Sequence, residues 1–384
     1  MTQQLTAVVA ALALLVPAAA RAEVKIGFIN TVTGAEAPIG ENLTNGVNLA
    51  VEDLAKKGIK ISLVKQDDTG KPDKAMGAME QLATGDEVAA IVGPYTSANA
   101  NAVAKLAEQY KVPQVIPAAA KEEITKQGYR WVFRLNAPAH QYAQSLLDAA
   151  LAFGKPTSVA FLYESTDFGN SVAAAGKEYA KAKGLKVVAD EAYQKGAADY
   201  RSTLTKLKAG NPDLVFMVSY VADAILLMRQ SRELGLKPQA FLGGGAGFDT
   251  AQFESEKDIS TNVFSVTQWT PESSKPATDF DGRYKAKFGK KPTYHAACAY
   301  ASMMIVGEVA ARAGGDREKI REALDTGAWP GTIMGQVKFA DQGGFTNQNQ
   351  LVMPVIQYQG GSANTVYPAK AAKKKAVYPF PGWK

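Results

Sequence analysis

The sequence holds few residues that could form a catalytic centre. It contains two histidines, His140 and His295, and one cysteine, Cys298, so a Ser-His-Asp triad or a histidine-rich metal site has little material. Neither the Gly-x-Ser-x-Gly pattern nor the P-loop pattern occurs. The run from Gly243 to Gly247 is similar to a phosphate-binding loop, but Phe248 replaces the third glycine of the dinucleotide fingerprint. We therefore expect a protein that is not an enzyme and that holds neither a metal nor a cofactor.

One stretch has the composition of an anion-binding site. From Ile91 to Ser97, a short apolar run is followed by a Gly-Pro pair, a tyrosine and two hydroxyl residues that open a helical pattern. This order predicts a strand, a turn and a helix that begins near Ser97. Free backbone N–H groups and the helix dipole favour a negative group at such a position. The pattern is equally typical of an ordinary capping serine, and both interpretations stay open at this point.

Short apolar runs alternate with amphipathic helical stretches as far as about residue 270, which is typical of βαβ units and parallel sheets. One series runs from Val24 to about Asn136, and a second with the same rhythm starts near Ser158. Strand-like segments from Gln336 to Phe339 and from Leu351 to Tyr358 end the chain. Strands are expected at 24–30, 59–65, 88–92, 114–116, 158–162, 186–189, 214–218 and 263–266. Helices are expected at 41–57, 74–82, 98–110, 141–153, 169–183, 200–208, 222–234, 277–288, 294–313 and 317–324.

These patterns predict an α/β fold of two doubly wound parallel-sheet lobes, joined by a hinge through which the chain passes three times. Lobe 1 is expected to comprise residues 23–138 and 268–345, and lobe 2 residues 139–267 and 346–384. The crevice between two such lobes is a natural place for a ligand.

The first 22 residues have the pattern of an export signal. Leu5 to Val16 is an apolar run too short to span a bilayer, and Ala20-Arg21-Ala22 is a small-x-small cleavage site. The segment lacks the usual basic residue before the apolar run, and a buried N-terminal helix is the alternative interpretation. Glu23, rather than a cysteine that could carry lipid, follows the predicted cleavage site near Ala22. We therefore predict a periplasmic protein.

A single cysteine excludes an intramolecular disulfide bond. Stability must then come from buried apolar surface, for which the chain is long enough. Formal net charge is +6, and the visible concentration of positive charge is the tail that holds Lys370, Lys373, Lys374 and Lys375. We interpret this tail as solvated rather than as a nucleic-acid or membrane patch. Because the protein is expected to be exported, we do not expect nucleic acid as a partner.

A series of short motifs runs in order along most of the chain. It includes Gly93-Pro94-Tyr95-Thr96-Ser97, Val112 to Ala120, Tyr163 to Gly169, Arg229 to Leu236 and Gly335-Gln336-Val337. In this order the chain resembles the periplasmic leucine/isoleucine/valine-binding proteins, which are type I solute-binding proteins of ABC uptake transporters. The resemblance implies a monomer that captures a small carboxylate or amino-acid ligand between its lobes and presents it to a membrane permease.

The resemblance also implies particular site residues. In the family, a serine at a helix start and backbone groups after the next strand hold the ligand carboxylate, and these positions match Ser97 and the segment that includes Ala118 and Ala120. Phe168 occupies the place of the lobe 2 aromatic residue that closes over the ligand, and Tyr220 that of a second aromatic residue.

Other positions depart from the family pattern. Ile39 stands where a first-lobe aromatic often lies near the ligand, and Trp269 is a further candidate beside a crossing. Gly245 falls at or near the acidic residue that receives the ammonium group in amino-acid binders. A buried ammonium without a partner is costly, so either another acid such as Asp249 receives it or the ligand lacks an α-amine. We favour a compact organic acid, aromatic or aliphatic, over a hydrophobic amino acid.

Two other functional classes can use this fold. The sensory ectodomain of a receptor would need a transmembrane or intracellular segment, and an exported enzyme would need a titratable cluster in the cleft. The sequence offers neither pattern, so we expect a binding protein. The identity of its ligand stays open at this point.

Overall fold

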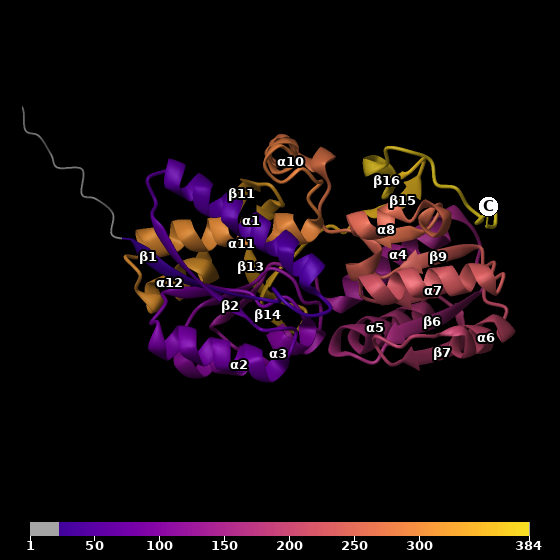
Figure 1. Ribbon diagram of the computed structural model, residues 1–384, viewed down its shortest axis with the longest axis horizontal. Coiled ribbons are helices and arrows are strands. Elements are labelled where there is room, and N and C mark those ends of the chain that lie inside the picture. The colour runs from indigo at the N-terminus through magenta and orange to yellow at the C-terminus, as the bar shows by residue number, and fades with distance from the viewer. Residues whose placement is uncertain (1–22, 384) are drawn as a thin grey trace, which may run out of the picture.

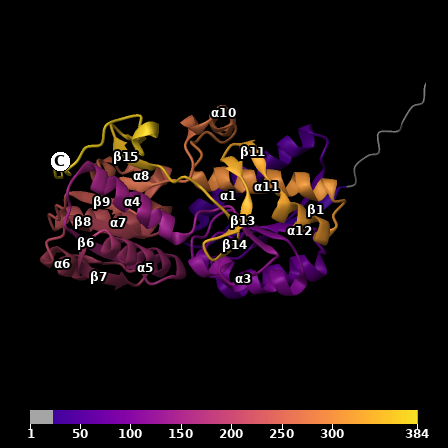
Figure 2. The same ribbon diagram turned by 180° about the vertical axis from the view of Figure 1, so that it is seen from behind.

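The computed structural model describes residues 23–383, so the predicted export signal at 1–22 lies outside the described residues. The described chain forms two lobes that lie side by side, each built on one seven-stranded sheet (Figure 1). The view from behind shows the same division, with the last strands of the chain shared between the lobes (Figure 2). Within residues 23–383, every helix is too short or too polar to cross a membrane.

The first sheet is parallel from β2 to β14, because apolar runs buried on both faces are separated by helices that cover those faces. Only the last strand, β13, is antiparallel to its neighbour. In spatial order the strands are β13 (Phe339–Gln342), β14 (Phe345–Asn349), β5 (Val132–Arg134), β4 (Gln114–Ile116), β3 (Ala90–Val92), β1 (Val24–Asn30) and β2 (Ile61–Asp67).

The second sheet repeats this plan, with five parallel strands and a C-terminal antiparallel hairpin that adds to β10. In spatial order the strands are β16 (Ser362–Tyr367), β15 (Val355–Gln359), β10 (Phe264–Val266), β9 (Ala240–Gly243), β8 (Leu214–Val218), β6 (Ser158–Glu164) and β7 (Lys186–Tyr193). A separate two-stranded ribbon pairs β11 (Trp329–Thr332) with β12 (Gly335–Val337).

Helices cover both faces of each sheet. In Figure 1, α1 and α11 lie on one face of the first sheet, and α2 and α3 lie on the other. The helices of this lobe are α1 (Ala37–Lys56), α2 (Pro72–Glu80), α3 (Ser97–Tyr110), α10 (Lys275–Phe288), α11 (Tyr294–Arg312) and α12 (Arg317–Thr326). Those of the second lobe are α4 (Ala139–Phe153), α5 (Asp167–Ala182), α6 (Arg201–Ala209), α7 (Val221–Glu233), α8 (Ala251–Ser255) and α9 (Lys257–Ser260).

The contact between α1 and α11 depends on a glycine. A Cβ atom at Gly46 would lie 2.2 Å from the carbonyl oxygen of Ala296, so no larger residue allows this approach. Most of α11 is buried, including Cys298, which is fully buried as the sequence predicted. Burial raises the pKa of the Cys298 thiol well above its usual range, so the group packs as a small apolar residue.

The predicted fold class is confirmed, and the described chain passes between the sheets three times. The passages lie between β5 and β6, between β10 and β13, and between β14 and β15. Strand β14 begins at Phe345 and pairs in the first sheet through Gln348. The last passage therefore lies between Asn349 and Val355, a few residues beyond the limit of 345 expected for lobe 1.

Candidate ligand-binding site

The start of α3 lies at the carboxyl edge of the first sheet, where β3 turns sharply. Gly93 has φ +109°, and a Cβ atom there would lie 2.0 Å from the carbonyl oxygen of Ile29. The helix cap is Thr96, whose Oγ1 accepts from the backbone N–H of Asn99 at 3.3 Å. Ser97 is therefore not the capping residue, and its hydroxyl group is directed elsewhere.

The Ser97 hydroxyl joins the helix to the segment that follows β4. Its Oγ accepts hydrogen bonds from the backbone N–H of Ala120 at 3.1 Å and of Lys121 at 3.3 Å. The Ser97 O–H remains available to donate, because the oxygen serves as acceptor in both contacts. A hydroxyl that can donate and a helix N-terminus thus meet at one place, which is an arrangement suited to an anion.

A buried arginine supports this segment from the core side. Arg134 is fully buried, and its Nη1 donates to the carbonyl oxygens of Lys121 at 2.5 Å and Ala119 at 3.3 Å. Its other donors reach Gln348 and Thr125. Burial lowers the pKa of Arg134 to about 10, so the group stays cationic at neutral pH. Glu122 and Glu123 act electrostatically on it and favour its charged form, so the guanidinium supports this segment mainly through its hydrogen bonds.

A small central cavity of about 20 Å³ lies between the lobes, beside these groups. Five residues expected from the sequence line it, and they come from both lobes: Ser97, Ala118, Ala120, Phe168 and Tyr220. The structure therefore brings together the predicted carboxylate-binding groups and the two predicted aromatic walls.

Three other predicted residues do not line this cavity. Ile39 is buried in the apolar core. Trp269 packs edge-on against Phe280, with ring centroids 5.7 Å apart, and lines a different cavity. Gly245 is the neighbour of the lining residue Ala246 and has φ +81°. A Cβ atom at Gly245 would lie 2.6 Å from Cε1 of a tyrosine ring in α4, so this glycine makes room for a wall of the site.

Sequence reasoning missed six lining residues: Tyr95, Asn136, Tyr142, Ala246, Tyr294 and His295. Tyr95 lies inside the Gly-Pro-Tyr-Thr-Ser motif, so the motif could have led to it. The others meet the site only through the packing of distant segments. Asn136 follows β5, while Tyr294 and His295 begin α11.

Aromatic rings form most of the cavity wall. The Phe168 and Tyr220 rings lie 5.6 Å apart, and Tyr95 approaches Tyr220 edge-on at 6.0 Å. His295 stacks on Tyr294 at 3.8 Å and meets the edge of Tyr95 at 5.4 Å. Offset and edge-to-face contacts of this kind suit a flat apolar group between the lobes.

The polar groups of the cavity are neutral. Burial lowers the pKa of His295 to about 3, so its imidazole is uncharged at neutral pH, and the lining residues include no carboxylate. The Tyr95 hydroxyl and His295 Nδ1 are buried and have no hydrogen-bond partner among residues 23–383. Both groups are therefore free to bond to a ligand.

Ion pairs between the lobes hold the cavity closed. Glu36, which is only 5% exposed, pairs with Lys195 of the other lobe, and the Lys195 Nζ lies 5.2 Å from the Tyr220 ring centroid. A second pair joins Lys121 to Asp167 at 2.9 Å. The structure is thus the closed arrangement of the two lobes. Among residues 23–383 there is no cluster of three or more His, Cys, Asp or Glu side chains placed to hold a metal.

Two doubly wound lobes, three connections and a cavity between them define the type I periplasmic binding protein fold. The family described as periplasmic binding protein matches residues 23–362, and the chain belongs to this family. A Leu/Ile/Val-binding protein homolog of Brucella suis biovar 1 is 31% identical over 383 residues, which cover 92% of this chain and 94% of that protein.

Solved structures agree with this assignment. The leucine-binding protein LivK of Thermotoga maritima is similar with a TM-score of 0.80 and 25% identity, over 89% of this chain and 97% of that one. A solute-binding protein of R. palustris in complex with benzoate is similar in fold, with a TM-score of 0.82 and 19% identity, over 93% and 98% of the two chains. The chain is a solute-binding protein of the branched-chain amino acid ABC transporter type.

Proposed function

We propose that the protein captures a compact carboxylate without an α-amine, of the benzoate type, in the central cavity. The ligand carboxylate is bound by the Ser97 hydroxyl and by backbone groups near Ala118. The backbone N–H of Ala120 holds the Ser97 hydroxyl in place. The ring or chain of the ligand packs against Phe168 and Tyr220. The protein is not an enzyme in this proposal, since it holds and releases its ligand unchanged.

The observation that carries the proposal is the absence of a carboxylate from the central cavity lining. The nearby acids are already bonded, Glu36 to Lys195 and Glu164 to Thr166 and the Tyr220 N–H. An ammonium group buried there would therefore meet no free counter-charge, at a cost on the order of several kcal/mol. A ligand carboxylate, by contrast, meets the Ser97 hydroxyl, the Tyr95 hydroxyl and the N-terminus of α3. In this closed arrangement the cavity measures about 20 Å³, far below the about 300–1,000 Å³ of usual small-molecule sites, so a ligand requires the lobes to open around it. Benzoate in the R. palustris protein is a precedent within the same fold.

The cellular setting follows from the family and the leader sequence. We propose cleavage near Ala22, a mature chain that starts near Glu23, and action as a monomer in the periplasm. Closure of the lobes over the ligand then presents a surface to the permease of an ABC transporter. Nucleic acid is not a partner in this proposal.

A thermal-shift screen of the mature chain tests the ligand class, because a ligand that binds the folded state raises the midpoint by mass action. The panel contains benzoate, 3,4-dihydroxybenzoate, short aliphatic acids, benzamide and leucine. We expect stabilisation by one or more acids and none by benzamide, which keeps the ring but lacks the charge. Strong stabilisation by leucine with none by the acids would overturn the organic-acid proposal and favour an amino-acid binder.

A further inference from the structure

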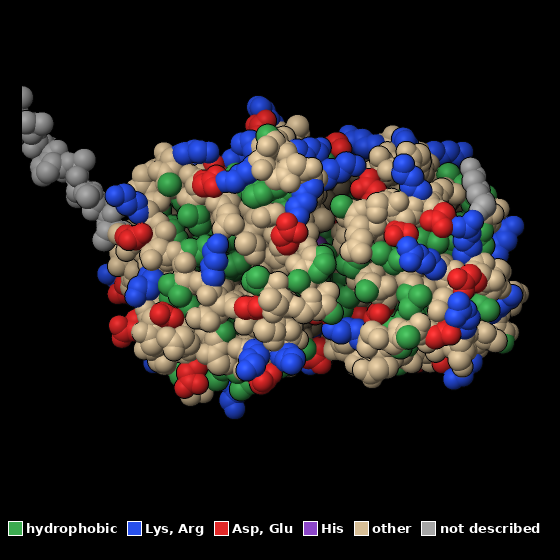
Figure 3. Space-filling model, in the orientation of Figure 1, with side chains coloured by type: hydrophobic (Ala, Val, Ile, Leu, Met, Phe, Trp, Pro, Cys, Tyr) green, Lys and Arg blue, Asp and Glu red, His purple; other side chains and the backbone are tan. Residues whose placement is uncertain are grey.

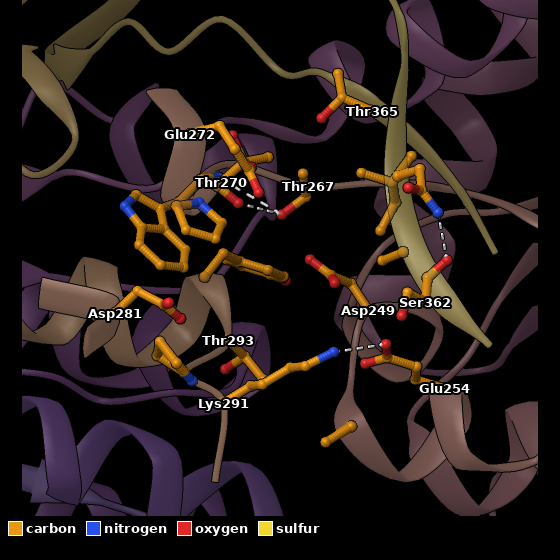
Figure 4. Close-up of a pocket in the computed structure, with 18 of the residues that line it drawn as sticks. Asp249, Glu254, Thr267, Thr270, Glu272, Asp281, Lys291, Thr293, Ser362 and Thr365 are labelled. Carbon is orange, nitrogen blue, oxygen red and sulfur yellow. Dashed lines mark hydrogen bonds and ion pairs between the residues drawn. The ribbon is translucent and has the colours of Figure 1, made fainter. Parts of the chain in front are cut away.

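A second cavity lies between the lobes, apart from the central one, and it has a free carboxylate oxygen. Its volume is about 380 Å³, and residues from α8, α10, the segment before α11 and the C-terminal hairpin line it. Of its lining residues, only Tyr294 also lines the central cavity. Figure 4 shows Asp249 with its carboxylate directed into this space, between Thr267 on one side and the Lys291–Glu254 pair on the other.

One oxygen of the Asp249 carboxylate lacks a partner in the described protein, while Thr267 interacts with the carboxylate through its side chain. Its Oδ2 atom is buried and has no hydrogen-bond partner among residues 23–383. Two of the three lysines of the cavity are bound to other acids, since Lys291 Nζ lies 3.0 Å from Glu254 Oε1 and Lys285 pairs with Asp281. Burial raises the pKa of Asp249 to about 7, as expected for a carboxylate without a counter-charge.

The charge of the whole lining is also unbalanced. Four carboxylates, Asp249, Glu254, Glu272 and Asp281, face three lysines, Lys285, Lys291 and Lys373. One negative charge therefore remains when Asp249 is ionised. The walls include the rings of Trp269, Tyr294 and Tyr358, and aromatic faces attract cations. A buried carboxylate oxygen, aromatic walls and one excess negative charge together fit a small organic cation.

We propose that this second cavity binds a small molecule through a primary ammonium group, with Asp249 as the counter-charge. The ammonium donates a hydrogen bond to Asp249 Oδ2, and the attached chain lies along the aromatic walls. The proposal does not rest on the ligand of the central cavity. Both lobes contribute residues, so an occupied second cavity requires the closed arrangement.

The test uses n-butylammonium as the probe, measured by calorimetry on the mature chain at pH 8 and constant ionic strength. We expect saturable binding to the wild-type protein. Asp249→Asn keeps the shape and removes the charge, and it should weaken binding about 10- to 150-fold, the range for loss of a charge-assisted hydrogen bond. Asp73→Asn removes an exposed acid in α2 and should leave the affinity unchanged, which controls for net charge.

A second variant covers the case in which Asp249→Asn does not fold. Ala251 is exposed and lines the cavity, so Ala251→Trp fills the space without altering a buried side chain and should also abolish butylammonium binding. Equal affinity of the wild type and Asp249→Asn would overturn the proposal. So would loss of both butylammonium and benzoate binding in a folded Asp249→Asn protein, because the two cavities would then act as one site. If benzoate did not bind while butylammonium bound as expected, the result would count only against the function proposed for the central cavity.

Discussion

Replacing Ser97 by alanine separates ligand binding from support of the backbone. The Ser97 Oγ accepts from the N–H groups of Ala120 and Lys121, and its own O–H is left to donate to a ligand carboxylate. Loss of that charge-assisted bond is worth about 1.5–3 kcal/mol, or about 10- to 150-fold in the dissociation constant for the bound acid. Calorimetry with the tightest acid of the screen measures this change.

The same substitution affects stability. The N–H of Ala120 loses its acceptor inside the protein, where the residue is only 1% exposed, so the free energy of unfolding should fall by about 1–3 kcal/mol. Thr96→Ala is the matched control, because it removes the capping hydroxyl one residue earlier. It should lower stability by about 1 kcal/mol and leave affinity nearly unchanged. If Ser97→Ala lost stability but kept wild-type affinity, Ser97 would only support the loop.

Three further predictions concern the walls, the closure and the pH dependence. Phe168→Ala and Tyr220→Ala should each weaken acid binding about tenfold or more, because apolar contact with the ligand is lost. Unchanged affinity with a lower melting temperature would mean that both rings only pack in the core. Glu36→Gln and Lys195→Met should each weaken acid binding, and a double-mutant cycle should give a coupling of about 0.5–3 kcal/mol, whereas additive effects would mean that the pair does not hold the lobes together. Burial raises the pKa of Glu164 from 4.5 to about 7, so the folded state binds this proton more tightly and the free energy of unfolding falls as pH rises from about 4.5 to about 7. Glu164→Gln should flatten this fall by up to about 3 kcal/mol in denaturant titrations at several pH values, and an unchanged slope would contradict the assignment.

The elements with strong periodicity were predicted well. The bounds of β1, β4 and β8 agree with the predicted 24–30, 114–116 and 214–218, because each is a continuous buried apolar run between turn residues. Strand β5 was missed, since it has only three residues and ends in Arg134, whose burial depends on acceptors far along the chain.

The C-terminal hairpins were only partly predicted, although the sequence contains their turns. Gly343-Gly344 and Gly360-Gly361 all have positive φ and join β13 to β14 and β15 to β16. Such Gly-Gly pairs between short runs predict hairpins. The residues of β14 are mostly polar, however, so they lack the apolar pattern that predicts a strand. Asn347, Gln348 and Asn349 are buried because they bond to backbone groups of the first sheet.

The candidate site was likewise predicted only where its residues follow a recognisable local pattern. Ser97 and the Ala118–Ala120 segment follow strands directly, so local order and family resemblance were enough to find them. Tyr294 and His295 reach the cavity because α11 packs on the first sheet, and the second cavity unites Asp249 with the far C-terminal hairpin. Such contacts between distant segments depend on how the lobes pack, which sequence patterns do not specify.

The most direct test of the central claim is a crystal structure of the mature chain with the tightest acid from the screen. We expect a carboxylate oxygen about 2.7–3.2 Å from Ser97 Oγ, with the rest of the ligand packed against Phe168 and Tyr220. A carboxylate bound away from Ser97, or an amino acid whose ammonium group meets an acidic side chain in the central cavity, would contradict it.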